Sequence, residues 1–287
     1  LDGDPENRGS VPLADENVAR LDEYMRAFNQ PNSTIELEQG TYANTGFTQW
    51  GASGLAVAWA EENTRDSIFK AFKRKETFAT TGTRIAVRFF AGYDLSSIDI
   101  NSESLISDAY EKGVTMGADL MQDENKTPEF IVWAQRDKNG APLQRVQIIK
   151  GWIDTNSGRP KEKVYDVACS DGMNVNPITN RCPDNGARVN ISDCSITNNV
   201  GSSELKTLWK DPDFVSSNKY FYYVRVLENP TCRWSTWDAI KRGHKPREDL
   251  HETIQERAWT SPIWYTPYES DVEVIPLGGT IRLRNID

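Results

Sequence analysis

Three side chains that follow a short apolar run could take part in chemistry: Glu61, Glu62 and Arg65. In folds with parallel strands, the carboxyl end of a strand faces the active site. A glutamate there can bind a metal, orient a metal-bound water or hold a substrate group, and the arginine could contact an anionic substrate. The structural alternative is that the glutamates stabilise the N-terminus of the next helix and that the arginine is an ordinary surface residue. We take all three as candidate catalytic residues.

Cysteine is the second reactive residue type, and the chain has four: Cys169, Cys182, Cys194 and Cys232. None forms a C-x-x-C pair, and His244 and His251 lie outside the cluster, whereas zinc ligands usually come in closer pairs. We therefore predict two disulfides, which form in the periplasm or outside the cell. The two isolated histidines are expected to be surface residues.

The expected disulfide pairing is Cys169–Cys182 and Cys194–Cys232. If residues 163–168 and 188–193 form an antiparallel hairpin, Cys169 lies at its loop end and Cys194 at its open end. A rise of about 3.3 Å per residue would separate these two by roughly 20 Å, which is too far for a bridge. A Cys169–Cys194 bridge would instead exclude this hairpin.

Composition limits the class of protein. The chain has 287 residues, of which 38% are hydrophobic, enough for a sizeable core in one or two domains. It carries 33 basic and 42 acidic residues, a net charge of −9, so nucleic acid is not an expected partner. No apolar run is long enough to span a membrane. The chain begins at Leu1, and we expect any targeting segment to lie upstream.

The candidate residues lie where the strand of one predicted strand–helix unit passes into its helix. Residues 55–60 form a nearly continuous apolar run, typical of a strand buried on both faces. Asn63 and Asp66 can begin a helix, whose buried stripe would be Ile68, Phe69 and Phe72, with the lysines and Arg74 facing water. We interpret this unit as the end of an incomplete α/β barrel.

The pattern changes at Arg84, after which apolar and polar residues alternate with the period of a half-buried strand. Strands are predicted at 84–89, 130–134, 146–152, 163–167, 220–228, 262–266, 273–275 and 281–284, the last two as a hairpin. A hairpin-type turn is predicted at 137–140, and helices at 15–28, 204–209 and 236–241. The fold class is therefore mixed α/β: residues 1–82 end a barrel, and residues 83–287 form a mostly antiparallel β-sandwich.

Several longer motifs resemble one bacterial family, the domain of unknown function 3604. They occupy residues 54–82, 146–152, 163–167, 233–238 and 254–265, and the resemblance extends from residue 5 to about 267. The arrangement of the four cysteines also resembles one branch of that family.

The resemblance implies a secreted or periplasmic metal-dependent hydrolase. Family members are usually longer, and their N-terminal part resembles a polymerase-and-histidinol-phosphatase type barrel with H-x-H and D-x-H metal motifs. Neither motif occurs in this chain. We therefore expect a divalent metal, zinc or manganese, held by an upstream segment of the same protein, which would also be the partner of this chain. The substrate would be a small molecule or ester, and the chain would form one wall of the active site and a stabilising β domain.

Two other functions are compatible with the sequence. Nine tryptophans could fill the core, or some could form a platform on which a β-sandwich binds a polysaccharide or peptide. A structural envelope protein without catalysis is the third possibility. Near the end of the chain, Glu256 and Arg257 are expected to form a buried pair.

Overall fold

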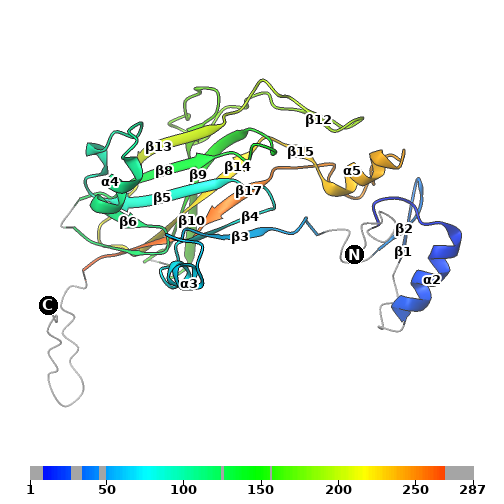
Figure 1. Ribbon diagram of the computed structural model, residues 1–287, viewed down its shortest axis with the longest axis horizontal. Helices are drawn as coiled ribbons and strands as arrows, with labels where there is room; N and C mark the ends of the chain where they lie inside the picture. The colour runs from blue at the N-terminus through cyan, green and yellow to red at the C-terminus, as the bar shows by residue number, and fades with distance from the viewer. Residues whose placement is uncertain (1–8, 27–33, 45–49, 124–125, 156, 269–287) are drawn as a thin grey trace, which may run out of the picture.

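The computed structural model describes residues 9–26, 34–44, 50–123, 126–155 and 157–268. Figure 1 shows a body of two β-sheets with a small lobe at one end. The lobe contains α2 (Asp15–Arg26), β1 (Thr34–Leu37), β2 (Gly40–Ala43) and α5 (Trp234–Lys241). Arg247 joins distant segments of this lobe, because its buried guanidinium donates hydrogen bonds to the backbone carbonyls of Gly9 at 2.7 Å and Ala43 at 3.1 Å.

The larger sheet of the body is almost entirely antiparallel. Its strands, in spatial order, are β10 (Pro160–Cys169), β9 (Leu143–Ile153), β14 (Tyr220–Glu228), β17 (Arg257–Thr260), β4 (Thr77–Thr80) and β3 (Leu55–Ala58). Strand β18 (Ile263–Thr266) pairs with β14 and runs parallel to β7 (Asp119–Met121). The long strands β9 and β14 form the centre of this sheet, and their apolar–polar alternation directs one face toward the core.

The smaller sheet covers that face. Its order is β13 (Glu204–Lys210), β8 (Glu129–Gln135), β5 (Ala86–Gly92) and β6 (Gly113–Thr115). Phe130 and Tyr222 meet between the sheets with ring centroids 4.6 Å apart, and both are fully buried. The outer side of the small sheet carries η2 (Leu95–Ser97) and α4 (Leu105–Lys112), which bury Phe90 and Leu105. The two sheets thus form the antiparallel sandwich that the alternation predicted.

The predicted α/β barrel is wrong. Strand β3 pairs antiparallel with β4, and within the described residues the single parallel pair is β7 with β18. Strand β3 lies at a sheet edge and is not buried on both faces, since Leu55 is 39% exposed. An apolar run indicates a strand, but it does not show which strand it pairs with. Here the next strand in the chain, β4, turns back after the helix and pairs antiparallel with β3.

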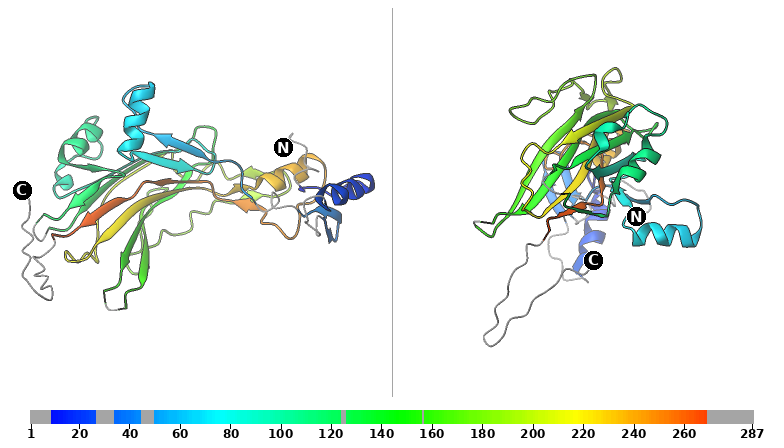
Figure 2. Two further views of the ribbon diagram at one scale, coloured as in Figure 1. Left: turned by 90° about the horizontal axis from the view of Figure 1, so that it is seen from below. Right: turned by 90° about the vertical axis from the view of Figure 1, so that its left-hand side faces the viewer.

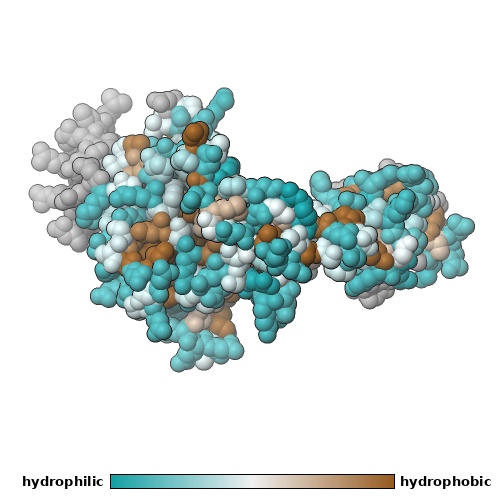
Figure 3. Space-filling model, turned by 90° about the horizontal axis from the view of Figure 1, so that it is seen from above, coloured by the Kyte–Doolittle hydropathy of each residue, from teal (hydrophilic) through white to brown (hydrophobic). Residues whose placement is uncertain are grey.

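The helix α3 (Arg65–Lys73) between these strands also differs from expectation. Its N-cap is Thr64, whose side chain accepts from Ser67 N, and Ala71 is its buried residue. Phe69 and Phe72, predicted to be buried, are 62% and 53% exposed. Figure 2 shows α3 projecting from the body beside α4, and Figure 3 shows apolar patches interrupting a mainly hydrophilic surface. The helix contacts the sheet along a narrower face than its sequence suggests.

Three other elements test the sequence analysis. Residues 204–210 form strand β13 and not the predicted helix, because they pair in register with β8, Leu205 opposite Ala134. The helix predicted at 236–241 is confirmed as α5. The turn at 137–140 does not close a hairpin, since it connects β8 of one sheet to β9 of the other. The predicted hairpin of strands 273–275 and 281–284 lies outside the described residues.

Both predicted disulfides are confirmed, Cys169–Cys182 and Cys194–Cys232. The hairpin used to choose them is wrong, because β10 pairs with β9 along its whole length. Cys194 instead follows β11 (Val189–Asn190) in a tight turn to β12 (Ser195–Ile196), and Cys232 ends β15 (Thr231–Cys232), which pairs with β16 (Thr253–Ile254). No helix among the described residues has the length and apolar character needed to cross a membrane.

Candidate functional site

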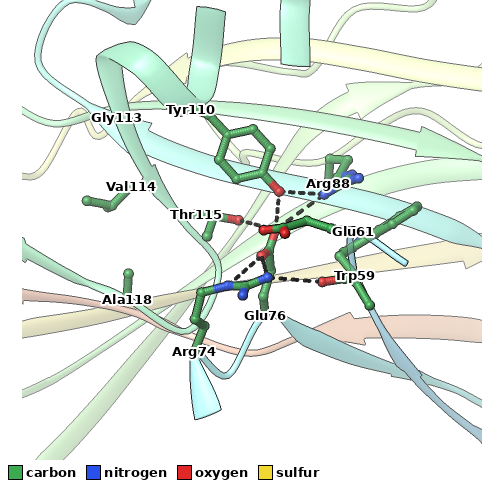
Figure 4. A pocket seen from close by; sticks show the side chains of 11 residues that line it. Trp59, Glu61, Arg74, Glu76, Arg88, Tyr110, Gly113, Val114, Thr115 and Ala118 are labelled. Atoms are coloured by element: carbon green, nitrogen blue, oxygen red, sulfur yellow. Dashed lines mark hydrogen bonds and ion pairs between the residues drawn. The ribbon is translucent and has the colours of Figure 1, made fainter. Parts of the chain in front are cut away.

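A pocket of about 630 Å³ opens between α3, α4 and the ends of β3 and β6. Its volume is in the range of small-molecule sites. The lining residues are Trp59, Ala60, Glu61, Arg74, Glu76, Arg88, Tyr110, Gly113, Val114, Thr115 and Ala118. Figure 4 shows that the polar ones converge on the carboxylate of Glu76. These residues come from α4, β5 and β6 and from the segments that follow β3, α3 and β6, so only the folded chain brings them together.

The end of α3 positions Glu76. Lys75 takes a left-handed conformation at φ 58°, its N–H donates to Phe72 O at 3.0 Å, and the N–H of Glu76 donates to Ala71 O at 3.1 Å. This pair of hydrogen bonds is the Schellman motif that ends many helices. Gly117 lies against the turn, where a Cβ atom would be 2.2 Å from the Lys75 carbonyl oxygen. The motif directs the next side chain into the pocket just before β4 begins.

Glu76 is buried, at 2% exposure, and its carboxylate is fully hydrogen-bonded. Arg88 Nη1 donates to Oε1 at 3.2 Å, and Arg74 donates to Oε2 from Nε at 3.4 Å and from Nη2 at 3.2 Å. The hydroxyls of Tyr110 and Thr115 also donate to Oε1. A buried carboxylate needs such compensation, and two guanidinium groups provide it.

Arg88 is fixed by an aromatic ring as well as by Glu76. Its guanidinium carbon lies 3.5 Å from the centroid of the Trp59 ring, a cation–π contact. The Trp59 ring is held in turn, because its Nε1 donates to Val87 O at 2.9 Å. Arg74 is more open, with a side chain that is 41% exposed, and Nη2 also donates to Trp59 O at 3.5 Å. Arg88 is therefore part of the floor of the pocket, and Arg74 faces its opening.

Tyr110 keeps its proton under ordinary conditions. Burial raises the pKa of its hydroxyl to about 12, and the hydrogen bond to Glu76 adds to that shift, while Arg88 opposes it. The hydroxyl is therefore a hydrogen-bond donor at neutral pH. It can support the carboxylate but cannot act as a base there.

The three candidate catalytic residues separate in space. Glu61 lines the pocket, and Figure 4 shows its side chain directed into it. Glu62 and Arg65 do not line this pocket; together with Glu61 they border a second, shallow hollow at the start of α3. The backbone N–H of Glu62 donates to Ser67 Oγ at 3.1 Å, as expected of a helix start. The structure thus groups Glu61 with the charged cluster and leaves Glu62 and Arg65 outside it.

The described residues do not fit the catalytic metal implied by the family resemblance. Among them, no three His, Cys, Asp or Glu side chains gather in a group that could hold a metal ion. In the pocket, the oxygens of Glu76 are occupied by Arg74, Arg88, Tyr110 and Thr115. We therefore derive no catalytic step through a metal at this site.

Sequence patterns did not predict the residues at the centre of the pocket. Arg74 was expected to face water, and no role was predicted for Glu76, Arg88 or Tyr110. The one available signal was Arg88, a charged residue inside a strand that is otherwise strongly apolar. The predicted buried pair of Glu256 and Arg257 does not form; Arg257 Nε donates instead to Gln255 O at 3.0 Å. Adjacent residues of a strand point to opposite faces.

The fold and pocket define an antiparallel β-sandwich with a charged cavity large enough for a small ligand. The chain belongs to the family described as a protein of unknown function, DUF3604, whose family model matches residues 15–267. Comparison with curated proteins gave no match, and neither did comparison with solved structures.

Proposed function

We propose that the chain is a binding module that holds a neutral, hydroxyl-rich ligand, such as a sugar unit of an oligosaccharide, in the Glu76 pocket. The observation that carries this proposal is the charge balance of the pocket. Two guanidinium groups, Arg74 and Arg88, face two carboxylates, Glu61 and Glu76. A strongly charged ligand of either sign would be repelled at short range by the two groups of like charge, whereas a neutral ligand would not.

The geometry provides both kinds of hydrogen-bonding partner that a sugar hydroxyl needs. Arg74 is held at the opening and has only donors, and Glu61 has only acceptors when ionised. Because Glu76 already holds the Arg74 side chain in the unbound protein, ligand binding would cost little side-chain entropy at Arg74. Hydrogen bonds to charged groups stabilise by about 1.5–3 kcal/mol each, which makes Glu61 a strong contributor.

The direct test is a matched pair of variants at adjacent positions. Isothermal titration with neutral hexasaccharides of glucose, xylose and mannose identifies a ligand for the wild type. Glu61→Gln should then weaken binding about tenfold, and Glu62→Gln, which alters the neighbouring side chain outside the pocket, should leave it unchanged. If none of the sugars binds below millimolar concentration, or if the two variants bind equally, this function is excluded.

A second function has one observation in its favour. Strand β3 has an open edge within the described residues, and the exposed Phe69 and Phe72 lie on the helix that follows it. An open edge and an apolar helix face are suited to pairing with further strands. In this alternative the chain forms one wall of a hydrolase cleft, with an upstream segment of the same protein holding the metal and the ester substrate.

This alternative predicts a complex that the binding module does not need. An upstream segment expressed separately should bind the chain and protect the β3 amides from hydrogen exchange. Phe69→Ser combined with Phe72→Ser should weaken that complex without altering sugar binding. Unchanged exchange of the β3 amides would exclude the shared cleft.

We also propose that the protein works in the periplasm or outside the cell. Two disulfides support this proposal, since such bonds persist in oxidising compartments. Cell fractionation followed by thiol labelling without reduction tests it, and four labelled cysteines in cytoplasmic material would contradict it.

A further inference from the structure

A second acidic cluster shares no residue with the pocket and is built very differently. Glu228 ends β14, and Glu256 lies directly opposite, because the N–H of Glu228 donates to Glu256 O at 2.9 Å. Side chains at such opposed positions share one face, with Cβ atoms roughly 4.5–5.5 Å apart. The loop before β5 adds Thr83 to the same cluster. Two like charges therefore face each other across neighbouring strands.

These groups are buried without partners. Glu228 is 0% exposed, and neither of its carboxylate oxygens has a partner at hydrogen-bond distance and angle, although the Thr83 hydroxyl and the Ala141 N–H lie close enough to lower its pKa against the effect of burial. Oε2 of Glu256 and the hydroxyl oxygen of Thr83 are buried in the same state. Buried polar atoms are almost always hydrogen-bonded, so four unpartnered oxygens in one place indicate that something binds them.

Within the part of the chain that the structure describes, no basic side chain pairs with these buried oxygens. The nearby carboxylate of Asp137 adds a third negative charge. Backbone hydrogen bonds and the positive charges of Arg84 and Arg136 lower the pKa of Asp137, and neither arginine is among the groups that affect the pKa of Glu228. Arg136 donates to carbonyl oxygens of its own loop, including Gly140 O at 3.0 Å. Burial, together with Glu256 and Asp137, raises the pKa of Glu228. The cluster thus combines several oxygens with a deficit of positive charge.

Gly140 lies directly against the carboxylate, where a side chain would not fit. A Cβ atom at this position would be 2.8 Å from one oxygen of Glu228 and 3.2 Å from the other. Any larger residue would therefore cover the two oxygens from the loop side. A proton shared by the two carboxyl groups, together with the hydroxyl proton of Thr83, is the competing way to satisfy these oxygens, and a melting temperature that does not respond to calcium would indicate it.

We propose that Glu228, Glu256 and Thr83 bind a calcium ion. Calcium takes six to eight oxygen ligands in flexible geometry, including bidentate carboxylates. Two carboxylates and a hydroxyl supply up to five of them, and water can complete the shell. The site is distinct from a catalytic metal centre, because it has no histidine and lies away from the Glu76 pocket. With two charged ligands, its Kd is expected on the order of 10⁻⁴–10⁻³ M, as in extracellular calcium modules.

The test measures thermal stability of the whole chain at pH 8, above the raised pKa of Glu228, which is about 7. Melting in CaCl2 at about ten times the Kd should occur roughly 3–5 °C higher than in EDTA. Equilibrium dialysis with radioactive calcium should give one ion per chain. A sodium chloride solution of equal ionic strength controls for general salt effects and should not reproduce the shift.

Variants identify the ligands. Glu228→Gln and Glu256→Gln should each abolish the calcium shift, and Glu228→Gln should melt in EDTA no lower than the wild type, because a buried unpaired charge has been removed. Glu129→Gln is the matched control: this glutamate is also buried, at 7% exposure, but accepts from Ser96 N at 2.7 Å, so its calcium shift should persist. Equal melting of the wild type in calcium and EDTA, or a normal shift in Glu228→Gln, would overturn the proposal.

Discussion

Two buried glutamates in this protein have opposite surroundings. Glu76 and Glu228 are 2% and 0% exposed; Glu76 directly precedes β4, and Glu228 is the last residue of β14, both strands of the larger sheet. Glu76 receives hydrogen bonds from Arg74, Arg88, Tyr110 and Thr115, whereas the oxygens of Glu228 have no partner at hydrogen-bond distance and angle. Equal burial therefore does not mean equal chemistry.

The two clusters differ in whether their charges are balanced within the chain. The Glu76 cluster balances its charges internally, so it can present fixed groups to a ligand without needing an ion. The Glu228 cluster has an excess of negative charge that the chain does not neutralise. A buried charge without a partner is strongly destabilising, so an external cation or a proton must supply the balance.

The largest expected effect follows from breaking the balanced cluster. Glu76→Ala leaves Arg88 without its carboxylate partner, and we expect a loss of about 3–5 kcal/mol in the free energy of unfolding. Urea denaturation at pH 7 measures it. Glu228→Gln, measured in EDTA at pH 8, should cost nothing or stabilise, and a similar loss in both variants would contradict the comparison.

The Glu228 cluster should make the free energy of unfolding depend on pH. Burial, Glu256 and Asp137 raise the pKa of Glu228 to about 7, above its ordinary 4.5. The folded chain therefore binds more protons than the unfolded chain between these values. The resulting stability is present below about pH 4.5 and is lost as the pH rises through 7, by on the order of 3 kcal/mol.

Denaturation in EDTA between pH 5 and 8 tests this dependence. Glu228→Gln should lack the corresponding decline, because glutamine does not titrate. If wild type and variant show the same slope, the decline has another origin. Calcium should reduce the slope in the wild type, since a bound cation favours the ionised carboxylate.

An intermediate effect is expected at the turn that positions Glu76. Gly117 has φ +87°, and a Cβ atom there would lie 2.2 Å from Lys75 O, so Gly117→Ala must displace the end of α3. Gly172→Ala is the control, because its φ of +67° is similar but nothing lies within 4 Å. The control should lose about 1 kcal/mol from backbone strain, and Gly117→Ala clearly more. Equal losses would show that the contact does not hold the turn.

The smallest effect is expected on the outer face of α3, the helix that carries Arg74 into the balanced cluster. Phe72 is 53% exposed, so Phe72→Ala should cost less than about 1 kcal/mol. Phe78→Ala, at a site that is 5% exposed, should cost about 3–5 kcal/mol. Thermal melts of the two variants decide the matter, and comparable losses would show that α3 packs more closely than described.

Local patterns predicted the sandwich well and the candidate site poorly. The alternation in Tyr220–Glu228 defines a strand with the bounds that the structure shows, because each residue's environment is fixed by the two faces of one sheet. Residues 204–210 contain both helix- and strand-forming residues, and pairing with β8 decided in favour of a strand. Of the three candidate catalytic residues, Glu61 alone lines the pocket, since a position after a strand says nothing about the elements packed around it.

Residue types and spacings were enough to predict the alternating strands, the helices α2 and α5, the family and the presence of two disulfides. All of these depend on residue types and on spacings within a short stretch of chain. The tertiary structure decided which strands pair, and it assembled both glutamate clusters. Glu76 meets Tyr110 and Thr115 across 34 and 39 residues, and Glu228 meets Glu256 across a strand pair. Burial and hydrogen bonding between such distant residues depend on how the sheets pack, and no local pattern records that.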